Sequence, residues 1–172
     1  ESMRELAGMT AAEAGFDIVR RQVSNWKSQF QSPEDALEHA SDPDEYFQAR
    51  AYARYEERKR GLNAVDFDDL IYMPVQLLEE SEVVRDYWRN RFDTVLVDEY
   101  QDTNTSQFRF ARLMAGENEN LCVVGDDDQS IYGFRGAEVE KILSFRKDFP
   151  SAKVITLQHN YRSVGTVLDA AN

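Results

Sequence analysis

The sequence has little cysteine, no long apolar run and no excess of basic residues, and each shortage excludes a class of protein. Cys122 is the one cysteine among 172 residues, so the chain has no disulfide framework of its own, which fits a reducing compartment. No apolar stretch approaches the roughly 20 residues that span a bilayer, and we expect no membrane segment. The first residues, Glu1–Arg4, show neither a signal-peptide pattern nor an initiating methionine, so we expect a start within a longer protein.

The balance of charge is strongly acidic. A formal net charge of −12 argues against the basic surface with which most proteins hold nucleic acid. The apolar fraction of 42% is enough for a core, so the chain is not a disordered tail. Its length suits one ordinary domain or a piece of a larger one.

The first part of the chain, to about Asn63, has the pattern of helices. Thr10–Glu13 is a capping box, and Ser32–Asp35 and Ser41–Asp44 are two further helix starts, each with a proline in the first turn. Arg58–Gly61 ends the last helix with basic residues and a glycine, and these cations either contact a phosphate backbone or form a solvated helix end. Apolar residues recur at three- and four-residue steps on one helix face: Phe16, Val19, Val23, Trp26 and Phe30.

Two more helices are expected before the pattern changes. Asp66 is placed to cap a helix whose first turn is acidic, and Pro74 kinks or divides that helix. Ser81 caps a further helix that extends to about Asn90. No internal repeat is evident along the chain.

From Phe92 onward, short apolar runs alternate with helical patterns. The apolar runs predict strands at Thr94–Val97, Leu121–Val124 and Val154–Leu157. Helices are predicted near Thr105–Ala115, near Glu138–Lys147 and after Ser163. This alternation is typical of a parallel sheet with crossover helices. The expected fold class is therefore α/β, with a helical N-terminal part followed by a parallel sheet.

Polar side chains follow each apolar run, at the carboxyl ends of strands where open α/β sheets place their chemistry. Asp98 and Glu99 suit a hard cation such as Mg²⁺ and an activated water. The alternative is that this acidic pair only ends the strand and begins a polar loop.

The second turn, residues 125–137, combines glycines, acids, an amide and aromatic residues. Gln129 both donates and accepts hydrogen bonds, so it suits a phosphate or a water. Tyr132, Phe134 and Arg135 alternate aromatic and cationic character, a mixture that stacks on unpaired bases and holds their backbone. The alternative is a surface turn whose aromatic residues pack beneath it as core.

The third turn, residues 157–163, offers a different pair of groups. Tyr161 presents a flat ring for a purine, and Arg162 presents a bidentate fork for a phosphate. His159 has no acidic partner nearby in sequence and is expected to be a packed or surface histidine.

Together, these segments resemble the superfamily 1A DNA helicases of the UvrD, Rep and PcrA type, and among them Rep. The residues that carry the resemblance are "VDFDDLI" at 65–71, "VDEYQDTN" at 97–104, "VVGDDDQSIYGFRGA" at 123–137 and "LQHNYRS" at 157–163. The last three look like the family's motifs II, III and IV. The resemblance implies an incomplete RecA-like sheet of the P-loop NTPase class. It also implies three parts: a helical accessory subdomain (1–64), the end of the first motor lobe (65–158) and the start of the second (159–172).

The resemblance also implies roles in ATP hydrolysis. Asp98 would hold Mg²⁺, and Glu99 would orient and deprotonate the attacking water. Gln129 would report on the γ-phosphate. Tyr161 would stack on adenine, and Arg162 would reach the γ-phosphate from the second lobe.

A further set of roles implied by the resemblance concerns single-stranded DNA and duplex junctions. Tyr132 and Phe134 would stack on bases, with Arg135 supporting that loop. Phe134 stands where many relatives have tryptophan and keeps the π face. Gly133 replaces a larger residue, which loosens the loop. The expected setting is DNA replication or repair in the cytoplasm.

The sequence contains no G-x-x-x-x-G-K-S/T phosphate loop. We therefore expect an inactive internal fragment of an ATP-driven 3′→5′ helicase. In relatives the phosphate-loop strand lies beside the strand leading into motif III, so its loss predicts an exposed sheet edge and self-association. Other possibilities are the motor lobe of a helicase–nuclease, a non-catalytic acidic interaction module, and a Mg²⁺ phosphohydrolase that uses Asp98, Glu99 and Asp126–Asp128.

Overall fold

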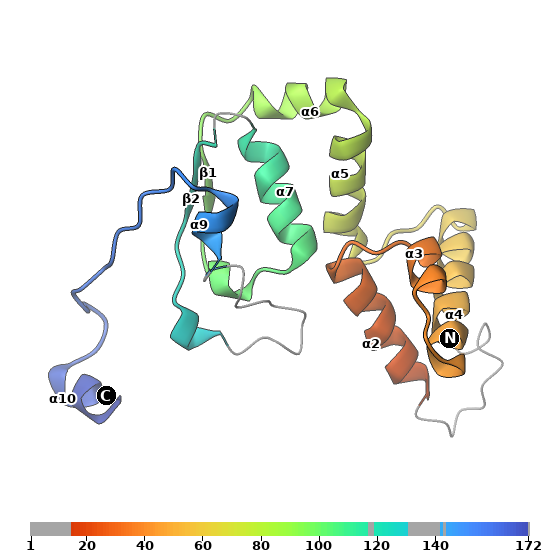
Figure 1. Cartoon of the computed structure of the whole chain (residues 1–172), viewed down its shortest axis with the longest axis horizontal. Coiled ribbons are helices and arrows are strands. Elements are labelled where there is room, and N and C mark those ends of the chain that lie inside the picture. The colour runs from red at the N-terminus through yellow and green to blue at the C-terminus, as the bar shows by residue number, and fades with distance from the viewer. Residues whose placement is uncertain (1–14, 117–118, 131–141, 143, 172) are drawn as a thin grey trace.

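A computed structural model describes residues 15–116, 119–130, 142 and 144–171 (Figure 1). The expected capping box at Thr10–Glu13 lies outside the described residues. So do Tyr132, Phe134 and Arg135, for which DNA contacts are predicted.

The first described part is a small helical layer made of α2 (Gly15–Ser28), α3 (Pro33–Glu38) and α4 (Pro43–Gly61). Two of the predicted helix starts are confirmed: Ser32 forms a capping box with Asp35, and Asp42 caps α4. The core of this layer joins apolar residues of all three helices. These are Val19, Val23, Trp26, Ala36, Ala49, Ala51 and Tyr52.

Phe30 departs from its predicted place on the helix face. The helix ends at Ser28, and Phe30 follows it with a φ of 59°, in the left-handed region. Its ring instead packs on Tyr72, at 4.8 Å between ring centres. The four-residue step from Trp26 to Phe30 therefore extends past Ser28, the last residue of the helix.

Two helices link this layer to the strands. Helix α5 (Asp69–Glu80) runs through Pro74 without being divided, and α6 (Glu82–Arg89) follows it after a single residue. That residue is Ser81, whose hydroxyl accepts a hydrogen bond from the Val84 N–H, as the sequence predicts for a cap. Figure 1 shows α6 extending across the top of the molecule from α5 toward the strands.

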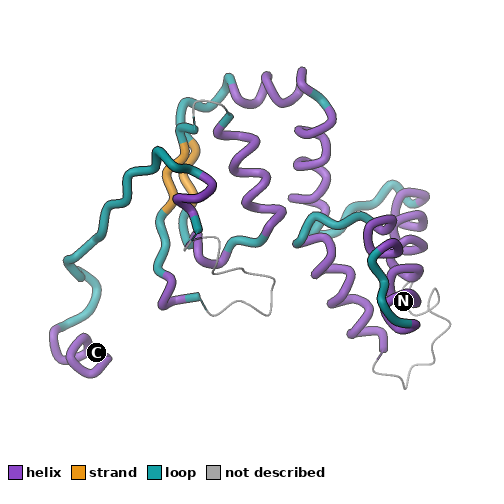
Figure 2. Tube along the Cα trace, viewed as in Figure 1, coloured by secondary structure: helices purple, strands orange, loops and turns teal. Residues whose placement is uncertain are grey.

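The sheet contains two parallel strands, β1 (Val95–Val97) and β2 (Leu121–Val123), with Leu96 opposite Cys122 (Figure 2). Helix α7 (Thr105–Ala115) makes the crossover between them and contacts both strands as well as α2, α5 and α6. Gly116, with a φ of 67°, ends α7 where the sequence places its stop. The α/β fold class is thus confirmed, in a mostly helical chain with a small parallel sheet.

One expected strand is wrong: Val154–Leu157 forms no strand. The segment lies between α9 (Phe145–Asp148) and α10 (Gly165–Ala171), with the side chains of Val154, Ile155 and Leu157 largely exposed. A strand needs a neighbour to satisfy its backbone groups, and among the described residues β1 and β2 pair only with each other. The helix predicted after Ser163 is confirmed as α10. Of the helix predicted near Glu138–Lys147, only the end is described, and it overlaps α9.

None of the described helices has the length and apolar character that a membrane crossing requires.

Candidate functional site at the carboxyl ends of the strands

The turn after β1 carries the acidic pair on an unusual backbone. Asp98 and Glu99 are exposed, and Glu99 has φ 50° and ψ 43°, a left-handed conformation that costs a residue with a side chain about 1–2 kcal/mol. The Glu99 N–H donates to Asp98 Oδ1 at 3.0 Å. A short 3₁₀ helix, η1 (Tyr100–Asp102), follows directly. The pair therefore projects from a constrained turn.

The turn after β2 holds Gln129 against Asp126. The short 3₁₀ helix η2 (Asp127–Gln129) begins after Asp126, whose carboxylate accepts the N–H of Asp128. The same carboxylate accepts a hydrogen bond from Gln129 Nε2 at 2.7 Å. Gln129 is exposed, so its amide sits at the surface of this turn.

The two turns are joined by hydrogen bonds that involve a residue the sequence analysis did not single out. Gln101 is only 1% exposed; its Nε2 donates to Glu99 Oε2 at 2.7 Å, and its Oε1 accepts the Asp126 N–H at 3.0 Å. The Tyr100 N–H also donates to the Val124 carbonyl at 2.9 Å. In the sequence, the only signal for Gln101 is its position, an amide two residues after the acidic pair.

Gly125 makes this close approach possible. A Cβ at this position would lie 2.6 Å from Gln101 Oε1 and 2.9 Å from Ile142 Cδ1. Any larger residue would push the second turn away from Gln101.

The third turn stands apart from the first two. The Tyr161 side chain is 93% exposed and stacks on His159 at 6.2 Å between ring centres. The Arg162 and Ser163 N–H groups donate to Asn160 Oδ1, so the turn is held by its own residues. Figure 1 shows this part of the chain running from α9 away from β1 and β2 toward α10. Among the described residues, the structure thus joins the Asp98–Glu99 turn to the Gln129 turn and leaves Tyr161 and Arg162 outside that group.

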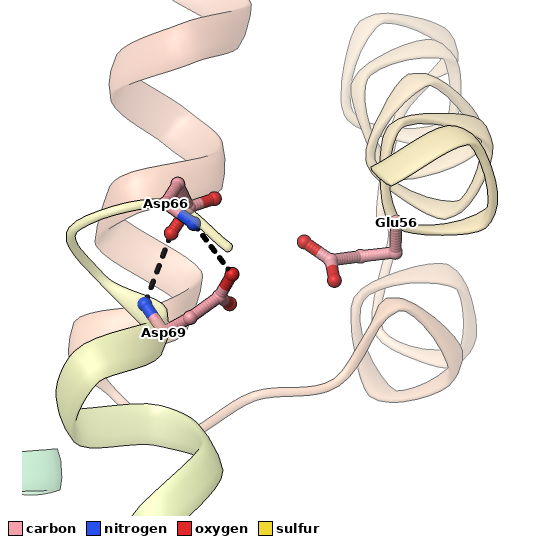
Figure 3. Close-up of side chains that lie close together, drawn as sticks. All are labelled: Glu56, Asp66 and Asp69. Carbon is pink, nitrogen blue, oxygen red and sulfur yellow. Dashed lines mark hydrogen bonds between the residues drawn. The ribbon is translucent and has the colours of Figure 1, made fainter. Parts of the chain in front are cut away.

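A second cluster of charged groups lies far from these turns, between α2, α4 and the start of α5. Asp66 and Asp69 exchange backbone and carboxylate hydrogen bonds, and Glu56 points toward them from α4 (Figure 3). Lys27 Nζ lies 2.7–2.8 Å from all three carboxylates. Lys59 Nζ reaches the same three at 2.5–3.2 Å.

The three carboxylates, with ligand atoms within 4.8 Å of one another, have the geometry of a possible cation site. Each of the three carboxylates is already paired with both ammonium groups, so the cluster is explained as a buried ion-pair network. The sequence suggested that Lys59 contacts a phosphate backbone or lies at a solvated helix end. Both interpretations are wrong for Lys59, because its side chain is buried. Arg58 and Arg60 are exposed.

The pKa values in this cluster show how strongly the charges support one another. Burial, the largest influence, disfavours charge on Lys27, yet its hydrogen bonds to Asp66, Asp69 and Glu56 together raise the pKa of Lys27 above its ordinary value. Burial also acts against ionisation of Asp66, but Lys27 and the Asp69 N–H hold the pKa of Asp66 well below its usual range. The pKa of Asp69 is lowered in the same way. Burial raises the pKa of Asp68, which accepts a hydrogen bond from Ser24.

Comparison with protein families matches residues 4–150 to the family described as UvrD/REP helicase N-terminal domain. Among curated proteins, the ATP-dependent DNA helicase PcrA of Staphylococcus aureus is 47% identical over 150 residues, which are 87% of this chain and 20% of that protein. PcrA of Staphylococcus epidermidis is 46% identical over 150 residues, which are 87% of this chain and 21% of that protein. The chain therefore spans about one fifth of the length of the curated relatives it matches.

Proposed function

The chain belongs to the UvrD/REP helicase N-terminal domain family, and on that basis we propose that it is an internal part of an ATP-dependent helicase that moves 3′→5′ along single-stranded DNA. The longer protein opens duplexes at their junction with single strands. The proposed setting is DNA replication or repair in the cytoplasm, and the similarity to a bacterial DNA helicase supports a DNA-processing role. The nearer resemblance to Rep within the family stays a prediction.

One observation carries the proposal: the acidic pair and the Gln129 turn form one hydrogen-bonded unit at the carboxyl ends of adjacent parallel strands. This edge is where α/β sheets bind nucleotides. Phosphoryl transfer requires positioned water and neutralised charge more than covalent chemistry by the protein. A carboxylate, a second carboxylate and an amide on fixed turns suit that task.

The residues of the first turn fit a magnesium ion that is shared with a nucleotide. Asp98 is exposed and its Oδ1 accepts the Glu99 N–H; no bond from a described residue engages Oδ2, which is therefore open to a cation. Mg²⁺ in such sites takes one or two carboxylates and completes its shell with phosphate oxygens and water. When bound, the ion would neutralise phosphate charge. Glu99, held by Gln101, would orient the attacking water and accept its proton.

Gln129, Tyr161 and Arg162 complete the proposed nucleotide contacts. Gln129 would sense the γ-phosphate, Tyr161 would stack on adenine, and Arg162 would bind the γ-phosphate. The exposure of Tyr161 and Arg162 in this chain leaves both side chains available to a nucleotide held by the rest of the longer protein. Tyr132, Phe134 and Arg135, which lie outside the described residues, are proposed to contact single-stranded DNA.

The chain by itself is proposed to be inactive, because it has no phosphate loop to hold the nucleotide. Mixing the 172-residue chain with ATP, Mg²⁺ and single-stranded DNA should release no more phosphate than its Glu99→Gln variant. Turnover above that control would refute this part of the proposal. Within the described residues, β1 and β2 pair only with each other, and we propose that their outer edges favour self-association, which light scattering at rising concentration would detect.

The experiment that tests the helicase proposal uses the longer protein and two partial duplexes. One duplex carries a 3′ single-stranded tail and the other a 5′ tail of equal length and composition. We expect ATP-dependent strand separation of the 3′-tailed substrate, with loss of separation in Asp98→Asn. Unwinding of only the 5′-tailed substrate would contradict the direction, and no unwinding of either would contradict the activity.

A further inference from the structure

We propose that Gln101 is a positioning residue that couples Glu99 to the Gln129 turn, so that the water-orienting carboxylate and the γ-phosphate sensor move as one unit. The inference deepens the proposed function and rests on it. It concerns a residue to which neither the sequence analysis nor the family comparison assigns a role.

The orientation of the Gln101 amide is fixed by its partners. A backbone N–H only donates, so the atom that faces the Asp126 N–H at 3.0 Å must be the carbonyl oxygen. The remaining NH₂ group therefore faces the Glu99 carboxylate at 2.7 Å, which only accepts. Both contacts agree with a single orientation, and the bond to Glu99 is strengthened by the charge of its acceptor.

The chain of hydrogen bonds continues beyond Asp126. The Asp126 backbone is held by Gln101, while its carboxylate accepts from Gln129 Nε2 at 2.7 Å. Glu99, Gln101, Asp126 and Gln129 thus form an unbroken series that begins at one exposed end and finishes at the other. The middle of the series, Gln101, is 1% exposed, so water does not replace its bonds.

The surroundings leave Gln101 little freedom to do otherwise. Gly125 packs so closely against Gln101 that a Cβ at position 125 would lie 2.6 Å from Gln101 Oε1. Glu99 sits on left-handed backbone at the base of the same turn, a conformation that persists only where neighbours hold it. A displacement of Gln129 is therefore transmitted through Asp126 and Gln101 to the Glu99 carboxylate.

The first test needs no activity and uses the 172-residue chain. Glu99→Gln removes the charge that Gln101 donates to, whereas the matched control Asp98→Asn removes the adjacent charge, which no described bond links to Gln101. In ¹⁵N-resolved NMR spectra, we expect Glu99→Gln to shift the Asp126 amide and the Gln129 side-chain amide more than Asp98→Asn does. Equal shifts in the two variants, or none in Glu99→Gln, would overturn the coupling.

The second test uses the longer protein and separates positioning from folding. Gln101→Met keeps the length of the side chain without its hydrogen bonds, and kcat for ATP hydrolysis should fall on the order of 10- to 100-fold with KM for ATP unchanged, because the misplaced group acts in the chemical step. Gln101→Glu should lose activity at neutral pH and recover part of it as the pH falls, since a protonated carboxyl at this position can again donate to Glu99. Wild-type kcat in Gln101→Met, or an unaltered pH profile in Gln101→Glu, would overturn the proposal.

The outcomes also separate this proposal from the proposed function. If the unaltered longer protein hydrolyses no ATP, the proposed function fails, and the NMR comparison still decides the coupling. If ATP is hydrolysed and Glu99→Gln abolishes it while Gln101→Met does not reduce it, the function stands and the positioning role of Gln101 fails.

Discussion

Two groups of acidic residues in this chain lie in opposite surroundings. Between α2, α4 and α5, three carboxylates meet two ammonium groups, and Lys27 is only 2% exposed. At the ends of β1 and β2, Asp98, Glu99 and Gln129 are exposed, and the described bonds engage one oxygen of each carboxylate of the acidic pair. The carboxylates of the first group are paired with lysines of the same chain, whereas those of the second each keep one oxygen that no described bond engages.

The comparison teaches that a cluster of acidic residues is not by itself a binding site. The Glu56, Asp66 and Asp69 cluster has metal-like spacing, yet its partners are cations of the chain. Removing water from a charged group costs free energy unless the group has a partner of opposite charge. Each charged group of the buried cluster must therefore be paired within the protein. The exposed turns face no such demand. We therefore propose that the first group stabilises the fold and that the second performs chemistry.

The largest effect is expected from breaking the buried cluster at Lys27. Loss of one partner from a buried ion pair costs about 3–5 kcal/mol, so Lys27→Met should lower the free energy of unfolding by that order. The control is Arg20→Met on the same helix, since the Arg20–Asp17 pair at 3.6 Å is exposed and is worth at most about 1 kcal/mol. Urea unfolding followed by circular dichroism measures both. Equal losses in the two variants would remove the distinction between buried and exposed charge.

Acid should weaken the same cluster. The folded-state pKa values of Asp66 and Asp69 are lowered, so their contribution to stability is present above the unfolded value of about 3.9 and is lost as the pH falls toward the folded values. Asp68, whose pKa is raised, opposes part of this loss. The urea concentration at the unfolding midpoint should therefore decrease as the pH is lowered below about 4. A midpoint that holds steady through this range would contradict the assignment.

A smaller effect is expected where the two turns approach each other. Gly125→Ala places a Cβ against Gln101 Oε1 and Ile142, and such overpacking costs about 1–3 kcal/mol. The control is Gly61→Ala at the end of α4, where a Cβ would meet nothing within 4 Å and a change of no more than about 1 kcal/mol, toward stability, is expected. Thermal unfolding compares them. A harmless Gly125→Ala would show that the turns are not tightly joined.

The smallest effect on stability is expected at the exposed pair. Asp98→Asn keeps an oxygen that accepts the Glu99 N–H, and surface substitutions of this kind change stability by no more than about 0.5 kcal/mol. The same urea titration used for Lys27→Met measures it. A loss comparable with that of Lys27→Met would make Asp98 a structural residue.

Local signals predicted most of the elements that depend on nearby residues. The caps at Ser32, Asp42 and Ser81, the stop at Gly116, and the first two strands follow from short patterns that the structure keeps. The acidic pair and the glutamine turn were also placed correctly after their strands.

The misses at Lys59, Gln101 and Val154–Leu157 depend on how distant parts of the chain meet, whereas the cap expected at Asp66 is a local miss, since α5 begins at Asp69 with Asp68 at its N-cap. Lys59 turns inward because Asp66 and Asp69 come to it from the start of α5, and Lys27 meets them across about 40 positions of sequence. Gln101 is buried because the second turn folds over it. Val154–Leu157 has strand-forming residues but no partner strand among the described residues. Composition and residue spacing do not specify such contacts between residues far apart in the sequence.

The central claim, that the exposed group performs chemistry, is tested most directly by ATP hydrolysis in the longer protein with single-stranded DNA present. Glu99→Gln should lower kcat by at least about 100-fold, the contribution typical of a positioned general base, while the unfolding midpoint remains that of the unaltered protein. Unchanged turnover in a folded Glu99→Gln protein would contradict the account.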